Sequence, residues 1–271
     1  MTNTTLVLGA TGKTGRRVYE QLTSMGLEVR AGSRSAAIPF DWEDERTWAP
    51  VLQGVSAVYL TYYPDLAFPG AVDRIRAFTA LAAEAGVRRV VLLSGRGEPQ
   101  AELSERAVID SGLEWTVVRC SFFMQNLDEG YLVDAVREGV IALPAGDVAE
   151  PFVDADDIAD VAVAALATDD HVGRVYELTG PRLLTFADLA AELSAVTGRE
   201  IAYIPLTSEQ YAEGAIEAGV PAEEVMGLVE LFSEVLDGRN AHLSDGVRQA
   251  LGRPARDFTA YARAAAPVWK V

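Results

Sequence analysis

A glycine-rich turn near the N-terminus carries the clearest chemical signal in the sequence. Gly9, Gly12 and Gly15 follow an apolar run at 6–8 and precede a stretch with helical periodicity. In such a strand, turn and helix, backbone amides and the helix N-terminus contact a pyrophosphate, because glycine lacks the Cβ atom that would block the approach. The spacing therefore predicts a dinucleotide-binding turn. The residues expected to contact the cofactor here are Gly9, Thr11, Gly12, Lys13, Thr14 and Gly15.

The tripeptide Gly12-Lys13-Thr14 also matches the end of a Walker A loop. That motif needs a further glycine five positions before Gly12, and position 7 is valine. The sequence therefore excludes a nucleoside triphosphate loop of this type. Lys13 either approaches a phosphate of the dinucleotide or is a solvated surface lysine.

The end of the second predicted strand discriminates between the two nicotinamide cofactors. An acidic residue about 20 positions beyond the glycines binds the ribose hydroxyl of NAD, whereas a basic residue accommodates the extra phosphate of NADP. Here the strand ends at Ser33-Arg34, without a carboxylate. A guanidinium and a hydroxyl suit a phosphate monoester, so we expect NADPH to be preferred over NADH. The alternative is an ordinary surface arginine in a loop.

Short β-branched or leucine-rich runs alternate with amphipathic stretches between residues 4 and 118. This alternation is typical of βαβ units, whose right-handed crossovers build a parallel sheet with helices on both faces. The expected strands are Thr5–Leu8, Glu28–Ala31, Ala57–Leu60, Arg89–Leu93 and Trp115–Val118. The expected helices are Lys13–Ser24, Ala71–Ala85 and Ala101–Ser111, each ending near a glycine. The pattern predicts an α/β fold with a Rossmann-like parallel sheet.

The chain after about Asn126 is expected to be mainly helical. One further strand is expected at Val175–Leu178, while a capping box at Thr185–Asp188 and a proline at 221 indicate two helix starts. No long Pro, Gly or Ser-rich linker marks an independent domain. We expect residues 1–150 to form the NAD(P)-binding core. Residues 151–271 are expected to complete that core and to cover the substrate cleft as a smaller, mainly helical lobe.

Composition restricts the partners of the chain. Its 40 acidic and 23 basic residues give a formal net charge of −17, which repels nucleic acid and anionic membranes at long range. The single cysteine, Cys120, excludes an internal disulfide, and the two histidines, His171 and His242, do not make a His-rich metal site. We expect no metal and a small-molecule substrate. A monomer and a homodimer both remain open.

The N-terminus of the sequence lacks a basic segment that would precede a leader peptide. No apolar run reaches the roughly 18 to 20 residues needed to span a bilayer. We therefore expect an unprocessed cytoplasmic protein.

With the glycine turn and Ser33-Arg34, two further segments make the chain resemble the NmrA-like branch of the atypical short-chain dehydrogenase/reductases. These segments are Phe40-Asp-Trp42 and Arg119-Cys-Ser-Phe-Phe-Met-Gln-Asn126. Residues 32–34, 40–48 and 122–126 look most like the ergot-alkaloid (festuclavine/agroclavine) reductases, which act on iminium or enamine intermediates with NADPH. The likeness covers nearly the whole length, and residues 152–160 are similar to the family's segment near the cofactor and substrate cleft.

The resemblance implies cofactor contacts at the ends of successive strands. Asp41 and Trp42 would lie beside the adenine. Without the resemblance, Trp42 and Trp48 would be interpreted as aromatic core residues. The contacts expected from the resemblance are Asp41, Trp42, Thr61, Tyr62, Ser94, Gly95, Cys120 and Phe122, with Ser94 and Gly95 near the nicotinamide ribose and 120–123 over the nicotinamide. The expected substrate-binding residues are Tyr63, Phe123, Asn126 and Phe152. The apolar residues from 122 to 124 fit a buried core equally well.

Ordinary short-chain dehydrogenases use a tyrosine acidified by a lysine four residues later, because a proton accompanies the hydride. Here the lysines are Lys13 and Lys270, and no tyrosine lies between Tyr63 and Tyr131. Glutamates at 98, 102 and 105 stand where the dyad would normally be. No catalytic residue is certain, and the candidates are Tyr62, Ser94, Glu98 and Glu102.

Two interpretations of these glutamates remain open. If the acceptor is an iminium or a similarly electron-poor group, hydride arrival neutralises a charge, no proton donor is needed, and Glu98 or Glu102 would stabilise the cation. Alternatively, they form a solvated helix start, where the helix dipole favours acids. Cys120 fits a small core residue better than a nucleophile.

Two functional hypotheses follow. The first is an NADPH-dependent reductase that transfers hydride to a small organic substrate, such as an imine, iminium, enone, quinone or ketone, in secondary metabolism. The second is a non-catalytic NADP-sensing regulator of the NmrA type, which the missing tyrosine and lysine pair motivates. The complete cofactor turn and the apolar segment after Arg119 favour the enzyme.

Overall fold

The computed structural model describes residues 4–270, whose contacts divide into two compact units. Unit 1 takes in the chain as far as Cys120, together with Ala155–Leu178 and Asp245–Pro254. Unit 2 takes in Ser121–Asp154, Thr179–Ser244 and the chain from Ala255 onward. This division differs from the single boundary that we expected at residue 150, because the chain returns to unit 1 twice after leaving it.

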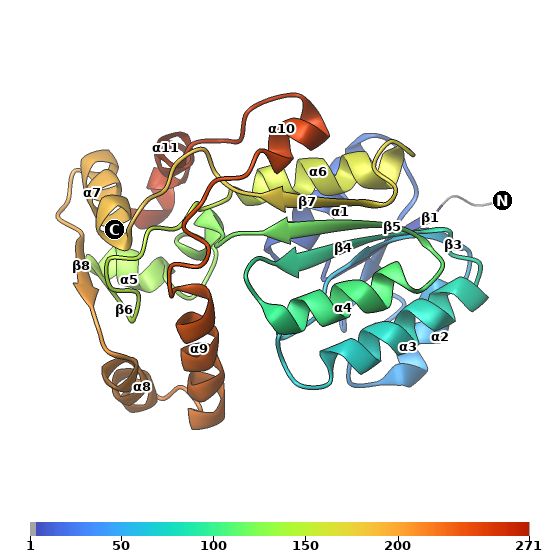
Figure 1. Cartoon of the computed structure of the whole chain (residues 1–271), viewed down its shortest axis with the longest axis horizontal. Coiled ribbons are helices and arrows are strands. Elements are labelled where there is room, and N and C mark those ends of the chain that lie inside the picture. Colours follow the sequence, from blue (N-terminus) through green and yellow to red (C-terminus); the bar gives the residue numbers. More distant parts are fainter. Residues whose placement is uncertain (1–3, 271) are drawn as a thin grey trace. The chain divides into compact units, whose positions relative to one another are not determined.

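Unit 1 is built on a six-stranded parallel sheet in the order β2-β1-β3-β4-β5-β7 (Figure 1). Its strands are β1 (Thr4–Leu8), β2 (Val29–Gly32), β3 (Val55–Leu60), β4 (Arg89–Gly95), β5 (Glu114–Cys120) and β7 (Arg174–Leu178). The expected Rossmann-like fold is confirmed, and each expected strand is present, with its ends differing by up to two residues. The order in which successive strands are added to the sheet reverses between β1 and β3, which places the carboxyl ends of these two strands at a ligand-binding position in folds of this type.

Helices cover both faces of this sheet. On one side α3 packs against α4, and on the other α1 packs against α6, which also contacts β3, β4 and β5 (Figure 1). The helices of unit 1 are α1 (Lys13–Ser24), α2 (Trp48–Leu52), α3 (Ala71–Glu84), α4 (Pro99–Ile109), α6 (Ala155–Ala167) and α10 (Gly246–Leu251), with a 3-10 turn at Glu45–Thr47. Because both faces are covered, the central strands carry consecutive apolar residues, such as residues 90–93 of β4, rather than alternating ones.

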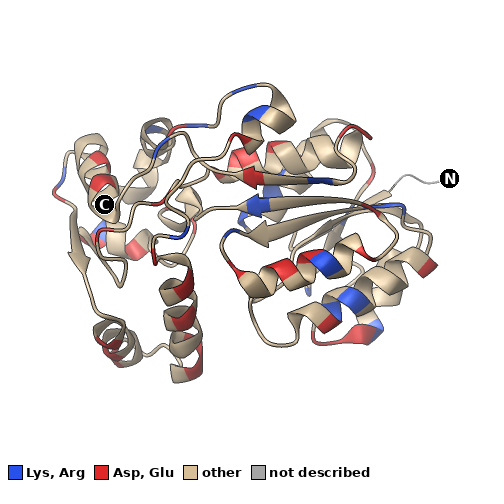
Figure 2. Cartoon of the chain, in the orientation of Figure 1, with Lys and Arg blue, Asp and Glu red and all other residues tan. Residues whose placement is uncertain are grey.

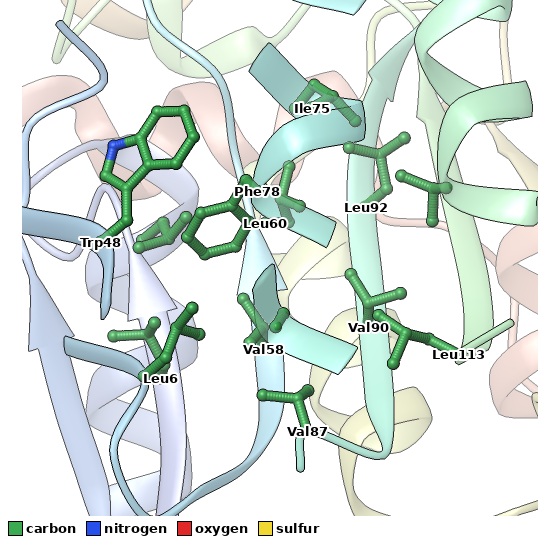
Figure 3. Close-up of a cluster of buried hydrophobic side chains, with 14 of the residues drawn as sticks. Leu6, Trp48, Val58, Leu60, Ile75, Phe78, Val87, Val90, Leu92 and Leu113 are labelled. Atoms are coloured by element: carbon green, nitrogen blue, oxygen red, sulfur yellow. The ribbon is translucent and has the colours of Figure 1, made fainter. Parts of the chain in front are cut away.

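On the α3 side of the sheet, alternate residues of neighbouring strands pack against α3 and a cluster of aromatic side chains. Leu60 and Leu92 point from the sheet toward Ile75 and Phe78 of α3 (Figure 3). Phe78 is 1% exposed, and its ring meets those of Trp42 and Trp48 edge to face at centroid distances of 5.3 and 5.7 Å. Aromatic pairs in this geometry add to the stabilisation that burial alone provides.

Unit 2 contains a small parallel sheet of β6 and β8 among helices. Its elements are a 3-10 turn at Met124–Asn126, α5 (Val133–Glu138), β6 (Val140–Leu143), α7 (Phe186–Thr197), β8 (Ala202–Pro205), α8 (Ser208–Glu217), α9 (Ala222–Val235) and α11 (Phe258–Trp269). The capping box at Thr185 and the helix start after Pro221 are both present. The two strands were not predicted, because each has four residues and β8 is largely exposed, so neither has a clear periodic pattern.

Replacing Phe78 by alanine tests the aromatic core. We expect Phe78→Ala to lower the free energy of unfolding by about 3–5 kcal/mol, because a large buried ring is removed and its neighbours cannot fully close the cavity. Urea titration measures the loss. The control is Leu103→Ala on α4, whose side chain is 44% exposed and whose loss should stay near 0.5 kcal/mol. Equal losses in the two variants would contradict this description of the core.

Candidate cofactor and active site

The glycine turn brings the start of α1 against the end of β1. A Cβ atom built on Gly15 would lie 2.2 Å from the backbone oxygen of Gly9, so α1 approaches the strand this closely only with glycine at 15. Gly9 has φ +64°, and a Cβ atom there would meet Thr61 Oγ1 at 2.6 Å. Both positions therefore require glycine, for packing and for backbone conformation.

The N-terminus of α1 has the character of an anion site. Gly12 is the N-cap, it supplies no side chain to cap the helix, and no acidic residue lies in the first turn. The backbone amide of Gly12 donates to the Gly9 carbonyl at 2.8 Å, which fixes the shape of the turn. First-turn amides and the helix dipole favour a phosphate here. These residues fit the diphosphate of a dinucleotide.

The end of β2 lies beside this turn. The backbone amide of Gly9 donates to the carbonyl of Gly32 at 2.9 Å, and Ser33 and Arg34 follow directly. Arg34 is exposed and forms no ion pair with any residue in the described range 4–270. Its guanidinium is thus not committed to a carboxylate of unit 1.

Asp41 and Trp42 differ in their surroundings. Trp42 is 7% exposed within the aromatic core, and its indole Nε1 donates to the Thr61 carbonyl at 3.1 Å. The Asp41 backbone carbonyl accepts from the indole of Trp48 at 2.9 Å, while its side chain is partly exposed. The structure therefore ties this loop to the end of β3, and Trp48 is a core residue at 2% exposure.

The segment after β3 contributes three predicted site residues. Thr61 Oγ1 donates to the Leu8 carbonyl at 3.2 Å, which joins the end of β3 to the end of β1. Tyr62 accepts through its hydroxyl from Arg74 Nη1 at 2.9 Å. Tyr63 is 74% exposed. Thr61 thus borders the glycine turn, Tyr62 is held by α3, and Tyr63 is open to solvent.

Ser94 belongs to a buried charged network that the sequence did not reveal. Its hydroxyl donates to Glu105 Oε1 at 2.6 Å, and Arg119 donates to both oxygens of Glu105 at 2.9 and 2.5 Å. Arg119 also pairs with Glu177 at 3.0 Å. Ser94 is 4% exposed and Glu105 is 3% exposed, so the serine proton is directed into the protein. The network joins α4, β4, β5 and β7.

Glu98 lies over Gly95 at the end of β4. A Cβ atom built on Gly95 would fall 2.0 Å from Glu98 Oε1, so this carboxyl group occupies the space that a side chain at 95 would fill. Asp65, in the segment after β3, lies close enough to Glu98 for Glu98 to influence the pKa of its carboxyl group. Burial raises the pKa of Asp65 above the ordinary range of an aspartic acid. Glu102, by contrast, lies exposed on the first turn of α4.

Cys120 ends β5 and is 4% exposed. Burial raises the pKa of its thiol well above the usual range, and the negative charge of Glu98 acts in the same direction. The thiol therefore stays protonated near neutral pH, which disfavours a role as nucleophile.

In unit 2, the predicted residues lie around an aromatic group. Phe152 is 2% exposed and meets Phe122 and Phe186 edge to face at 5.6 and 5.3 Å. Phe123 and Asn126 are partly exposed at the 3-10 turn. Phe152 is thus a core residue of unit 2, whereas Phe122, Phe123 and Asn126 retain accessible surface.

The chain matches a known protein family in sequence. The sequence pattern of the NAD(P)H-binding family matches residues 9–169, more than half of the chain. The chain belongs to this NAD(P)H-binding family. It is an NAD(P)H-dependent oxidoreductase by this match and by the named activities of its relatives.

Two curated relatives match over nearly their full lengths. The NAD(P)H azoreductase of Xenophilus azovorans is 33% identical, with 96% of each chain covered. The agroclavine dehydrogenase of Claviceps fusiformis is 34% identical, with 98% of each chain covered.

The Escherichia coli NADPH-dependent quinone oxidoreductase complexed with NADPH shares the fold, with a TM-score of 0.80 at 24% identity over 96% of this chain and 98% of that one. NmrA also shares it, with a TM-score of 0.73 at 16% identity over 99% and 97% of the chains. The resemblance to NmrA-like proteins and clavine reductases is confirmed.

The charge of this oxidoreductase is unevenly distributed along the chain. Residues 1–120 hold 13 basic and 14 acidic side chains, so nearly all of the net charge of −17 lies after Cys120. Residues 200–238 hold nine acidic side chains and no basic one, and Figure 2 shows acidic residues on both α8 and α9. The segment with the glycine turn is therefore close to neutral, which removes the apparent conflict between an acidic protein and an anionic cofactor.

Residues 4–270 lack two other kinds of feature. No helix in this range is both long enough and apolar enough to cross a bilayer. Nor does the same part of the chain gather three His, Cys, Asp or Glu side chains in a group that could hold a metal ion.

Asp65, Glu105 and Arg119 are the site residues that sequence reasoning missed as partners. The sequence analysis names Glu105 and a segment that begins at Arg119, but only the packing of α4 on β5 brings the two side chains together. Asp65 gave one usable signal, because an acid soon after a parallel strand lies near the edge where ligands bind.

A substitution at Gly15 tests the turn. We expect Gly15→Ala to weaken NADPH binding by about 100-fold or more, because its methyl group forces α1 away from the end of β1 and misplaces the first-turn amides. Fluorescence titration with NADPH measures the change. The control is Gly214→Ala on α8, where an added Cβ meets nothing within 4 Å. A Gly15→Ala protein that is folded and binds NADPH normally would contradict this role.

Proposed function

We propose that this oxidoreductase is an NADPH-preferring reductase that transfers hydride to a small, electron-poor organic acceptor. The observation that carries the proposal is the open N-terminus of α1, held against β1 by Gly15 and followed at the end of β2 by Arg34 instead of a carboxylate. The first feature suits a diphosphate, and the second suits an additional phosphate monoester.

Selection of NADPH rests on Arg34 and Ser33. A carboxylate at the end of β2 would repel the 2′-phosphate, and none stands there. Arg34 offers several donors in a planar arrangement that matches phosphate oxygens, and Ser33 adds a hydroxyl donor. Because Arg34 has no ion pair among the described residues, binding a phosphate would break no existing salt bridge.

When bound, the nicotinamide cofactor supplies a hydride, and the protein supplies binding and orientation. Amides of the glycine turn hold the diphosphate, Arg34 and Ser33 hold the adenosine end, and Thr61 and Gly95 border the cofactor at the ends of β3 and β4. Cys120 remains a neutral thiol and forms no bond to substrate. This division of roles needs no tyrosine and lysine dyad.

The acceptor class is supported by the relatives and by the residues present. The two curated relatives are named for the reduction of azo compounds and for agroclavine, both small organic molecules. Ser94 directs its proton to Glu105, so it is not available to polarise a ketone oxygen as a hydroxyl donor. We therefore favour iminium, quinone and azo acceptors over simple ketones.

Replacing Arg34 tests the cofactor preference. We expect Arg34→Leu to weaken NADPH binding by about 10- to 100-fold, the size of one or two lost charge-assisted hydrogen bonds, and to leave NADH binding unchanged. Parallel titrations with both cofactors measure the ratio. The control is Arg76→Leu, an exposed arginine on α3 that pairs with Asp73. An equal effect of Arg34→Leu on the two cofactors would remove the basis for NADPH preference.

Turnover tests the reaction class. Loss of NADPH absorbance is followed with a cyclic imine, a quinone, an azo dye and a simple ketone at equal concentrations. We expect oxidation of NADPH with at least one of the first three and slower oxidation with the ketone. Tight NADPH binding without turnover on any acceptor would contradict a reductase and would instead support a cofactor sensor.

A further inference from the structure

A polar cavity lies beside β7, the last strand of the unit 1 sheet. It is lined by residues of β7, of the turn that precedes β7 and of α10, which packs against that strand (Figure 1). Its volume is about 520 Å³, within the range of small-molecule sites. Three strands separate β7 from β1, so this cavity is distinct from the glycine turn. The lining side chains include Asp170, His171, Arg174, Val175, Tyr176 and Ala250.

Two buried polar side chains form part of the cavity wall. His171 is 8% exposed and Tyr176 is 6% exposed, and the Nδ1 atom of His171 lies 2.9 Å from the Tyr176 hydroxyl oxygen. Burial lowers the pKa of His171, which keeps the imidazole neutral near neutral pH. A phenol donates more strongly than it accepts, so we assign the hydrogen of this bond to Tyr176. The remaining proton of the neutral imidazole is then on Nε2.

The Nε2–H group of His171 is an unused donor. Among residues 4–270, none accepts a hydrogen bond from it, although the side chain is almost fully buried. Buried polar groups in folded proteins are nearly always hydrogen-bonded, because an unmade bond destabilises the protein. A donor of this kind in a cavity wall indicates a ligand that accepts from it.

Two opposite charges line the same cavity. Arg174 begins β7, Asp170 lies in the turn before it, and both side chains are exposed. Neither forms an ion pair with the other or with any further residue in the described part of the chain. The guanidinium and the Nε2–H group of His171 together offer donors that match a carboxylate, whereas Asp170 matches an ammonium group. Val175, which is 39% exposed, and Ala250 add apolar surface.

We propose that this cavity binds a small zwitterion of the amino-acid class with an apolar side chain. The ligand carboxylate accepts from His171 Nε2 and from Arg174, and the ligand ammonium group pairs with Asp170. A ligand with both charges fits better than a ligand with one, because a lone carboxylate is repelled by Asp170 and a lone amine is repelled by Arg174. The site is independent of the proposed reductase function.

Nuclear magnetic resonance tests the proposal, because the chain has two histidines. In a His242→Gln variant, the ring of His171 gives the single remaining imidazole signal. We expect L-leucine to shift this signal saturably, with a dissociation constant below about 1 mM. A carboxylate beside Nε2 favours the imidazolium, so the pKa of His171 should also rise when the site is saturated. A signal that L-leucine does not shift would overturn the proposal.

Two analogues separate the charges of the ligand. Isocaproate lacks the ammonium group of leucine, and isoamylamine lacks its carboxylate. We expect each to bind about 10-fold more weakly than L-leucine or worse, because each loses one charged contact and retains one repulsion. Equal affinities for the three compounds would contradict a zwitterion site.

Variants at the two exposed charges assign each contact in the same His242→Gln background. Arg174→Gln should weaken both L-leucine and isocaproate by about 10-fold, whereas Asp170→Asn should weaken L-leucine and leave isocaproate bound at least as tightly as before. The matched control is Arg106→Gln, an exposed arginine on α4 outside this cavity, which should leave every affinity unchanged. Unaltered L-leucine affinity in both cavity variants would overturn the proposal.

Discussion

The close approach of α1 to the end of β1 is the constraint on which the rest of the site depends. Gly15 packs its Cα directly beneath the carbonyl of Gly9, and Gly9 in turn leaves room for Thr61 from β3. The end of β1, the start of α1 and the segment after β3 thus converge, with the hydroxyl group of Thr61 against Gly9. The first turn of α1 also has no acidic side chain, so its amides suit the diphosphate of the proposed function.

Two further arrangements give this edge of unit 1 its chemical character. The first 120 residues are close to electrically neutral, so nearby groups determine the electrostatic potential at the glycine turn. The excess of acidic residues lies later in the chain. Two buried acids, Glu98 and Glu105, lie near this edge, and Glu105 is paired with Arg119.

The parallel sheet was predictable because its strands are short apolar runs separated by helices that end at glycines, and helix α1 was predicted with its observed bounds. The glycine turn was predictable for the same local reason. Strands β6 and β8 were not, because four partly exposed residues show no periodicity. The partners of Ser94 and Glu98 could not be predicted, since Glu105, Arg119 and Asp65 reach them only through packing of elements distant in sequence. Burial of Phe152 likewise follows from its aromatic neighbours and from no local pattern.

A crystal structure of the protein soaked with NADP tests the central claim most directly, because it locates each phosphate group. The account predicts diphosphate oxygens within hydrogen-bonding distance of the backbone amides at the start of α1, and the 2′-phosphate against the guanidinium of Arg34. Diphosphate density elsewhere, or a glycine turn that stays closed to the cofactor at saturating concentration, would contradict it.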